Sequence, residues 1–275
     1  MERDTLREFF ELHQSGGLIS LAAAEQAMMA GGCSLHEVED AALAAGYLPR
    51  RYERNRNLLS LEDQLKLHRS CVAVVGCGGL GGHGAEMLAR CGVGRLICID
   101  PDSFAEHNLN RQRFCTISSL GLPKAQVIAE ELRNINPSTL VSAHVEAFRL
   151  SRAAELLGPA DVVVDALDSF DARAELAAAC SALGRPFVHG AIGGWYGQFA
   201  MQAAGSNSLG QWLSACRGKS GIDEQLGNPS FTPAFIASLQ VAGTIRILLG
   251  KDDMAWGNVF FCDLRQMSFD AGSLG

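Results

Sequence analysis

The stretch CVAVVGCGGLGGHGAEMLARCGVGRLICID, residues 71–100, decides the fold. It opens with an uninterrupted apolar run at 71–75, which is typical of a strand buried on both faces of a parallel sheet. A glycine cluster and a helical stretch to about residue 91 follow, and a second apolar run at 95–99 ends at Asp100. This succession of strand, glycine loop, helix and strand predicts a βαβ unit that binds a nucleotide.

The spacing of the glycines supports this prediction. Gly76, Gly78 and Gly81 satisfy the pattern G-x-G-x-x-G directly after a strand. A residue without Cβ lets the chain turn tightly and approach a phosphate, while the following helix points its first amides and its positive dipole end at the anion. Asp100 closes the next strand, where an acid accepts hydrogen bonds from ribose hydroxyls. A purely structural turn is the alternative, but strand, loop, helix and acid all favour a nucleotide.

The rest of the chain extends this unit into a larger sheet. Strands at 140–145, 161–165 and 186–190 alternate with helices, which predicts a Rossmann-like α/β fold with a mostly parallel sheet and helices on both faces. These helices are expected at about 123–135, 151–158 and 171–183. After residue 190 we expect antiparallel C-terminal strands at 197–203 and 258–264, and a polar loop at 204–231 between them. We expect a helix capped by Thr232, with Pro233 at its first position and Gly250 just past its end.

The N-terminal residues have a different pattern. Residues 4–46 predict short helices, with Ser34 and Glu37 forming a capping box at the third. A basic cluster from Arg50 to Arg56 and a short helix at about 60–68 come next. We therefore divide the chain into a small N-terminal helical extension, residues 1–48, and a nucleotide-binding domain, residues 49–275.

Composition restricts the class of partner. The chain has 275 residues, 48% of them hydrophobic, so an ordered core is expected. Its net charge of −7 disfavours nucleic acid and anionic membranes as partners. The first ten residues lack the apolar run of a signal peptide, and the apolar stretch at 234–249 is interrupted by Gln240 and Arg246. The nine cysteines form no C-x-x-C pair. We expect a cytoplasmic protein with reduced thiols and no membrane span.

Cationic and polar residues after Asp100 distinguish the kind of nucleotide. Asn108, Arg111, Gln112 and Lys124 follow the acid closely, and such a set suits a triphosphate better than the dinucleotide of a hydride-transfer enzyme. A solvated basic loop is the alternative. Asp165 and Asp168 stand at the end of another predicted strand, where a carboxylate can hold Mg²⁺ against phosphates. Capping of the next helix by Asp168 or Ser169 is an equally good explanation.

Together these motifs resemble the ThiF/MoeB/HesA family, bacterial relatives of the ubiquitin-activating enzymes. The resemblance spans about residues 50–265. The matching motifs are RYERN (51–55), VVGCGGLGG (74–82), GVGRLICIDPD (92–102), NLNRQ (108–112), GLPKA (121–125), NINP (134–137), DVVVDALDS (161–169) and SLQVAGTIRILLG (238–250).

The resemblance implies that residues 49–275 form an adenylation domain that uses ATP and Mg²⁺. Its substrate would be the C-terminal Gly-Gly carboxylate of a small ubiquitin-like sulfur carrier, as in thiamine or molybdopterin synthesis. By resemblance Asp100 holds the ribose, Asp168 holds Mg²⁺, and Arg54 reaches into the partner's ATP site across a C2 homodimer. The loop that cradles the nucleotide would be Gly76, Gly78, Gly79 and Gly81, and the phosphate contacts Asn108, Arg111, Gln112 and Lys124.

Three features depart from the family. Many members bind a structural zinc through two C-x-x-C pairs, which this chain lacks, so no structural zinc is expected. Ser169 stands where many relatives have Asn. Cys216 lies where some relatives carry a sulfur-transfer cysteine, and Arg217 and Lys219 would lower its pKa, although an unreactive loop thiol is the alternative.

Other functions stay open at this point. Within the same superfamily, a tRNA threonylcarbamoyl-adenosine dehydratase-like enzyme has a similar DxxDS motif, but the negative net charge of the chain disfavours binding of tRNA. A nucleotide-binding adaptor without catalysis would use residues 1–48 to dock another protein, and an NAD oxidoreductase is a further alternative. Trp195 and Tyr196, after Gly193 and Gly194, are candidate contacts for a carrier tail, with core packing as the alternative.

Overall fold

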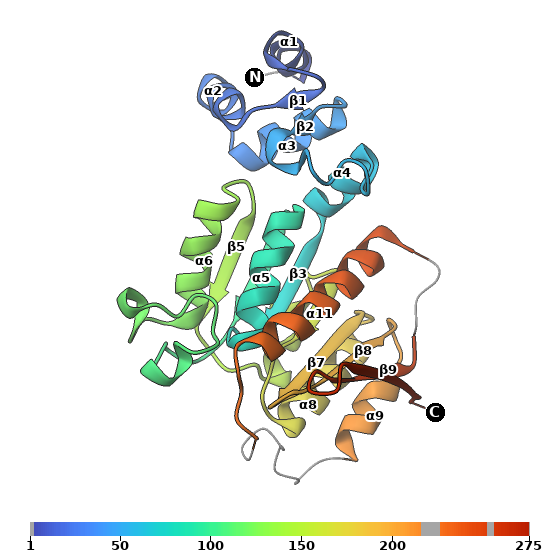
Figure 1. The fold of residues 1–275 in the computed structure, drawn as a ribbon. Helices are drawn as coiled ribbons and strands as arrows, with labels where there is room; N and C mark the ends of the chain where they lie inside the picture. The colour runs from blue at the N-terminus through green and yellow to red at the C-terminus, as the bar shows by residue number, and fades with distance from the viewer. Residues whose placement is uncertain (1–2, 216–225, 252–255, 275) are drawn as a thin grey trace.

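The computed structural model describes residues 3–215, 226–251 and 256–274. Its main feature is an eight-stranded sheet in the order β10-β9-β8-β7-β6-β3-β4-β5 (Figure 1). The five strands from β7 to β5 are parallel, and β8, β9 and β10 are added antiparallel. The strands are β3 (Cys71–Val75), β4 (Arg95–Ile99), β5 (Leu140–His144), β6 (Val162–Asp165), β7 (Phe187–Gly193), β8 (Tyr196–Gln202), β9 (Asn258–Asp263) and β10 (Ser268–Ser273). The predicted fold class is confirmed.

Helices cover both faces of this sheet. On one face lie α5 (Gly79–Cys91), α6 (Lys124–Ile135) and α11 (Phe231–Leu249), and on the other α7 (Ala153–Leu157), α8 (Phe170–Ala182) and α9 (Ser208–Ser214). Alternate residues of β3 point into the two cores, with Val72 and Val74 in one and Ala73 and Val75 in the other. This is why the strand has no polar residue.

The strand order places a crevice beside the glycine loop. From β3 the chain continues to β4 and β5 on one side, and then returns to β6 on the other side of β3. Such a reversal separates the loops at the carboxyl ends of the strands, and ligands of open α/β sheets bind there. The short 3₁₀ helices η2 (Glu106–Asn108), η3 (Ile117–Ser119) and η4 (Leu150–Arg152) lie in the connections that follow β4 and β5.

The N-terminal extension packs at the opposite end of the sheet (Figure 1). It contains α1 (Arg3–His13), α2 (Leu21–Gly31), α3 (Leu35–Ala44) and the paired strands β1 (Leu18–Ile19) and β2 (Leu48–Pro49), around its own apolar core. The predicted capping box of Ser34 and Glu37 is present at α3. After η1 (Arg50–Tyr52) comes α4 (Leu61–Arg69). The boundary at residue 48 stays a prediction, because Leu48 and Tyr52 pack in one cluster across it.

Polar contacts connect the extension to the rest of the chain. Arg69 of α4 donates two hydrogen bonds to the carboxylate of Asp40, at 2.6 and 2.9 Å. His68 Nε2 lies 3.0 Å from the carbonyl oxygen of His36. Arg51 pairs with the buried Glu39 and donates to Ser138 Oγ at 2.9 Å. These contacts fix the extension against the amino ends of the strands.

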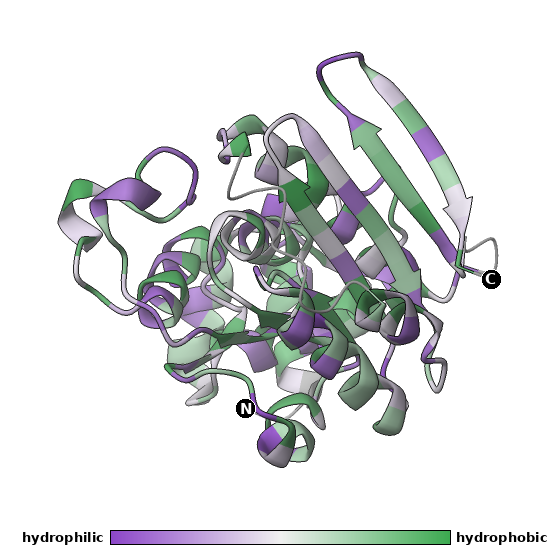
Figure 2. Cartoon of the chain, turned by 90° about the horizontal axis from the view of Figure 1, so that it is seen from below, coloured by the Kyte–Doolittle hydropathy of each residue, from purple (hydrophilic) through white to green (hydrophobic). Residues whose placement is uncertain are grey.

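The C-terminal third differs from the prediction in detail. Helix α11 begins at Phe231 rather than after a Thr232 cap, because the Thr232 hydroxyl is buried and donates to the carbonyl oxygen of Gly194 at 2.6 Å. The expected loop at 204–231 contains α9, and β10 was not predicted. Seen from below, β9 and β10 extend at one side of the molecule, with hydrophilic residues interrupting the hydrophobic ones along β10 (Figure 2). Edge exposure of β10 explains its weak pattern.

Helix α11 is long and apolar enough to cross a membrane by length and composition alone. It packs instead against α5, β7 and β8, and 56% of its apolar window is buried inside the protein. Within the described residues it is the one helix that meets this criterion, and its packing is that of a core helix.

Candidate nucleotide site

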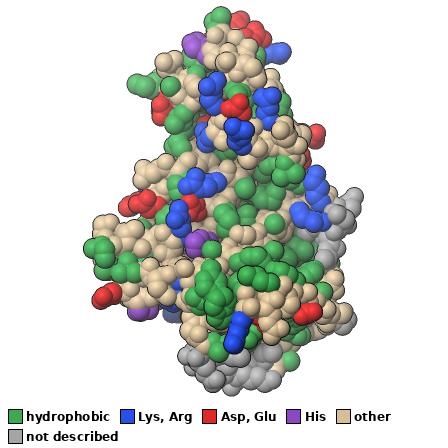
Figure 3. All heavy atoms as spheres, in the orientation of Figure 1, with side chains coloured by type: hydrophobic (Ala, Val, Ile, Leu, Met, Phe, Trp, Pro, Cys, Tyr) green, Lys and Arg blue, Asp and Glu red, His purple; other side chains and the backbone are tan. Residues whose placement is uncertain are grey.

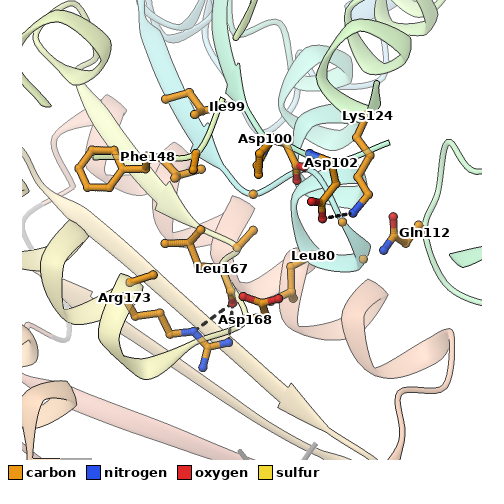
Figure 4. A pocket seen from close by; sticks show the side chains of 18 of the residues that line it. Leu80, Ile99, Asp100, Asp102, Gln112, Lys124, Phe148, Leu167, Asp168 and Arg173 are labelled. Atoms are coloured by element: carbon orange, nitrogen blue, oxygen red, sulfur yellow. Dashed lines mark hydrogen bonds and ion pairs between the residues drawn. The ribbon is translucent and has the colours of Figure 1, made fainter. Parts of the chain in front are cut away.

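A cavity of about 410 Å³ opens at the carboxyl ends of β3, β4 and β6, where the strand order reverses. It is lined by the glycine loop, by the start and the middle of the β4–α6 connection, by the first residue of α6 and by the turn between β6 and α8 (Figure 4). Most residues predicted from the sequence for nucleotide binding meet here. Those that line the cavity are Gly76, Gly78, Gly79, Asp100, Arg111, Gln112, Lys124 and Asp168.

The glycine loop needs its glycines for two different reasons. Gly76 has φ +93, and a Cβ there would lie 2.4 Å from the carbonyl oxygen of Ala166. A Cβ on Gly81 would lie 1.8 Å from the carbonyl oxygen of Gly76, so Gly81 lets helix α5 start directly beneath the loop. Gly81 therefore shapes the cavity from behind, and the first turn of α5 faces it with free amides.

Asp100 lies under this loop and is 5% exposed. Its carboxylate accepts hydrogen bonds from the amides of Cys77, at 2.6 Å, and of Asp102, at 2.8 Å. Burial raises the pKa of Asp100, and the two backbone hydrogen bonds oppose that rise. Asp100 thus connects the glycine loop to the β4–α6 connection, a role that the sequence analysis did not foresee, while its contact with a ribose stays a prediction.

Lys124 supplies one cation of the cavity. It is the first residue of α6 and 7% exposed, and its ammonium donates to Asp102 Oδ2 at 2.9 Å. Asp102, which was not singled out from the sequence, is mostly exposed. The pair is half exposed, because Lys124 is buried while water reaches the carboxylate of Asp102. An incoming phosphate can therefore take the place of that carboxylate at Lys124.

Arg111 and Gln112 come from the turn that follows η2. Arg111 Nη1 donates to the carbonyl oxygen of His107 at 2.9 Å, and Gln112 Oε1 is buried without a hydrogen-bond partner within the described residues. Asn108 does not line the cavity. Its side chain accepts from the amide of Ala105 at 3.0 Å and its carbonyl oxygen accepts from the amides of Arg111 and Gln112, so here it positions the two neighbours.

The turn between β6 and α8 carries Asp168 and leads to Arg173. Asp168 is exposed at the cavity, and no side chain of the described residues is hydrogen-bonded to its carboxylate. Arg173, 7% exposed, lines the same cavity and donates to the carbonyl oxygen of Leu167 at 3.0 and 2.6 Å. No sequence motif points to Arg173, because an arginine in a helix pattern is usually a solvated residue.

An apolar wall completes the cavity on the side away from Lys124. Ile99, Phe148 and Leu167 line it (Figure 4). Phe148 was missed by sequence analysis, since it lies in an irregular connection far from every motif. A flat apolar surface next to three carboxylates and three cations suits a ligand with an aromatic base at one end and phosphates at the other.

Arg54 and Cys216 are the remaining site residues predicted from the sequence. Arg54 is exposed in the turn after η1, beside the amino ends of the strands, and so lies at the opposite end of the sheet. Cys216 lies outside the described residues. The other eight cysteines are free thiols, and burial raises the pKa of Cys71 to about 11.

The residues present suit Mg²⁺ bound together with a nucleotide. No group of three or more His, Cys, Asp or Glu side chains within the described residues could hold a metal by itself. Mg²⁺ is usually bound through one or two carboxylates plus substrate phosphates and water. Asp168 offers a carboxylate at the cavity that is paired with no side chain in the described part of the chain.

Comparison with known proteins agrees with this geometry. The ThiF family profile matches residues 52–274. The Thermus thermophilus "sulfur carrier protein adenylyltransferase" is 33% identical over 231 residues, covering 80% of this chain and 84% of the relative. The Haloferax volcanii "SAMP-activating enzyme E1" is 31% identical, covering 76% and 78%. The Arabidopsis thaliana "adenylyltransferase and sulfurtransferase MOCS3" is 40% identical over 154 residues, covering 54% of this chain and only 33% of that longer relative.

Solved structures show the same fold. A crystal structure of E. coli MccB with ATP is 20% identical, with a TM-score of 0.69, and covers 82% of this chain and 71% of its own. A crystal structure of PaaA gives a TM-score of 0.67 at the same identity and covers 82% and 73%. The profile match extends over most of the chain, from the basic cluster through the glycine loop to the last strand. The chain therefore belongs to the ThiF family.

Proposed function

We propose that this protein is an ATP-dependent adenylyltransferase that activates the C-terminal Gly-Gly carboxylate of a small ubiquitin-like sulfur carrier. The observation that carries the proposal is the cavity at the strand reversal, where the start of α5, Lys124, Arg111 and Asp168 surround one space. The names of two relatives support the substrate class, since one is called a sulfur carrier protein adenylyltransferase and the other a SAMP-activating enzyme E1.

The proposed step joins two anions. A carboxylate oxygen of the carrier attacks the α-phosphorus of ATP, a new P–O bond forms, and the bond to the bridging oxygen breaks so that pyrophosphate leaves with its electron pair. The nucleophile is already ionised, so no general base is required. Lys124 and Arg111 lower the repulsion between the reactants and offset the charge that develops on the leaving group.

Mg²⁺ held by Asp168 would supply further charge neutralisation on the phosphates. Asp100 and the glycine loop would bind the ribose and phosphates, and Ile99, Phe148 and Leu167 would pack against the adenine. The proposed roles divide the cavity into an apolar end for the base and a charged end for the reacting groups. Binding at both ends orients the α-phosphorus toward the open side of the cavity.

The carrier tail would enter beside the turn between β7 and β8. The amide of Gly194 donates to the carbonyl oxygen of Gly227 at 2.7 Å, and next to this contact the rings of Trp195 and Phe231 pack at 4.6 Å while 47% and 40% exposed. Figure 3 shows that hydrophobic side chains also gather over α11 on this face. Exposed aromatic pairs are common at protein interfaces, which supports a role for Trp195 in docking.

A homodimer is part of the proposal. Arg54 lies at the opposite end of the sheet from the cavity of its own chain, so it can serve the ATP site only in a second copy. The resemblance assigns Arg54 this role. A cytoplasmic location is also proposed, and the free state of the eight described cysteines supports it.

Exchange of labelled pyrophosphate into ATP tests the proposed activity. The purified protein should catalyse exchange only when a carrier ending in Gly-Gly is added, and a carrier whose last glycine is removed should be inactive. Turnover that depends on tRNA instead of a carrier would show a dehydratase. Nucleotide binding without exchange under any condition would show an adaptor, and either result would refute the proposal.

A further inference from the structure

A buried ion-pair geometry lies directly behind the proposed ATP site. Asp165, at the end of β6, and His189, on β7, are both fully buried. His189 Nδ1 lies 2.7 Å from Asp165 Oδ2. A carboxylate can only accept, so Nδ1 carries the proton and His189 donates. Nothing in the proposed chemistry uses either residue directly.

Asp165 also organises the turn that follows it. Its Oδ1 accepts from the amide of Leu167 at 3.0 Å, and its carbonyl oxygen accepts from Gln240 Nε2 at 2.6 Å. Arg173 Nε lies 3.9 Å from Asp165 Oδ2, and the same guanidinium donates twice to the carbonyl oxygen of Leu167. The backbone of residues 165–167 is therefore fixed by contacts from β7, α8 and α11.

This fixed turn has two neighbours that matter for the nucleotide. On one side the carbonyl oxygen of Ala166 lies so close to Gly76 that no Cβ fits between them. On the other side is Asp168, whose carboxylate has no hydrogen-bonded side chain among the described residues. The separation between the glycine loop and the carboxylate of Asp168 is thus set by the turn, and Asp165 accepts three of the hydrogen bonds that fix the turn.

Burying this carboxylate is costly. A charge removed from water costs several kcal/mol unless hydrogen bonds and a partner compensate, and an apolar pair would fill the same space at no such cost. His189 Nε2 is itself buried without a partner within the described residues, which adds to the cost. Because this pair contributes little to stability, we expect its role to be the positioning of neighbouring residues.

We infer that Asp165 and His189 are positioning residues, which hold Asp168 at the separation from the glycine loop that a Mg²⁺-nucleotide complex needs. The inference rests on the proposed function, because it assigns Asp168 to the metal. Removing the donor of His189 would free Asp165 to shift, and the Leu167 amide and Asp168 would shift with it. Loss of such supporting partners typically lowers metal affinity about tenfold or more.

The test measures nucleotide binding rather than turnover. The dissociation constant of a fluorescent ATP analogue is determined in excess Mg²⁺ and in EDTA, and the ratio of the two reports how much Mg²⁺ strengthens binding. In His189→Asn the amide nitrogen replaces Nδ1 and can still donate to Asp165. In His189→Gln the amide lies one bond further out, near the place of Nε2. Gln202→Met is the control, since Gln202 is buried on β8 and contacts Ala177 and Gly210 but not the turn.

We expect the factor by which Mg²⁺ strengthens nucleotide binding to fall about tenfold in His189→Gln. It should stay unchanged in His189→Asn and Gln202→Met. Asp168→Ala should abolish the effect, and adding His189→Gln to it should cause no further loss. If His189→Gln and the wild type gave equal ratios, the inference would be overturned and the proposed function would still stand. The same would follow if Gln202→Met lost as much of the Mg²⁺ effect as His189→Gln. A wild-type protein that binds no nucleotide, or binds it equally with and without Mg²⁺, would overturn the assigned site as well.

Discussion

Substituting Gly76 by alanine tests whether the glycine loop and the turn after β6 form one rigid unit. Gly76 has φ +93, a conformation that costs an L-residue about 1–2 kcal/mol. The added Cβ would lie 2.4 Å from the oxygen and 2.7 Å from the carbon of the Ala166 carbonyl, so backbone must move. Overpacking of this kind costs about 1–3 kcal/mol more.

We therefore expect Gly76→Ala to lower the free energy of unfolding by about 2–5 kcal/mol, a large part of the 5–15 kcal/mol of an ordinary domain. Because the loop and the turn move apart, affinity for ATP should fall too, by more than tenfold. Urea unfolding followed by circular dichroism gives the first quantity, and titration with a fluorescent ATP analogue gives the second.

Gly84→Ala is the matched control, since it adds the same methyl group in α5. No atom lies within 4 Å of a Cβ at Gly84, and alanine is the better helix former by about 1 kcal/mol. This variant should be as stable as the wild type or slightly more stable, with unchanged ATP affinity. If Gly76→Ala unfolded at the same urea concentration as Gly84→Ala and bound ATP equally well, the close contact between loop and turn would not exist.

Three further outcomes are expected. Arg54→Ala and Lys124→Ala should each be inactive. A re-associated one-to-one mixture should regain about a quarter of wild-type exchange, because half of the dimers are mixed and each mixed dimer has one complete site. No recovery would exclude Arg54 acting in trans. Burial lowers the pKa of His68 to about 4, so the folded state binds fewer protons than the unfolded chain and stability should fall as the pH drops from about 6.5 to 4. His68→Gln, which can still donate to His36, should flatten that slope by up to about 1.4 kcal/mol per pH unit, as measured by urea unfolding at several pH values. Trp195→Ala should raise the KM for the carrier and leave the KM for ATP unchanged in the exchange assay; equal changes in both would remove Trp195 from carrier docking.

Much of the parallel sheet and its nucleotide loop was predictable from sequence, because both depend on local patterns. The run at 71–75 is apolar since both faces of β3 are covered, and the glycines mark places where backbone meets backbone. The C-terminal strands were harder. Strand β10 is an exposed edge with few apolar residues, and Thr232, which fits a helix cap by residue type, instead donates from within α11.

The missed residues of the site share a different cause. Phe148 and Arg173 reach the cavity from a connection and a helix that carry no motif, so only the three-dimensional arrangement brings them there. His189 lies in an apolar strand, and its partner Asp165 is 24 residues earlier in the chain. Asn108 shows the converse, because it lies within the matching motif and yet supports Arg111 and Gln112 from outside the cavity.

Asp100 and Asp165 together explain how a loop of glycines can be rigid. Asp100 directly follows β4 and Asp165 is the last residue of β6. These strands lie on either side of β3, so both acids flank the loop that follows β3. Asp100 holds the Cys77 amide, and Asp165 fixes the turn against which Gly76 packs. Two carboxylates near a triphosphate would repel it, but both are engaged by backbone or imidazole donors. Acids at the strand ends therefore fix the loop, and Lys124 and Arg111 remain to attract the phosphates. Loss of either acid should mainly loosen the loop, and should have a smaller effect on the charge around a bound nucleotide.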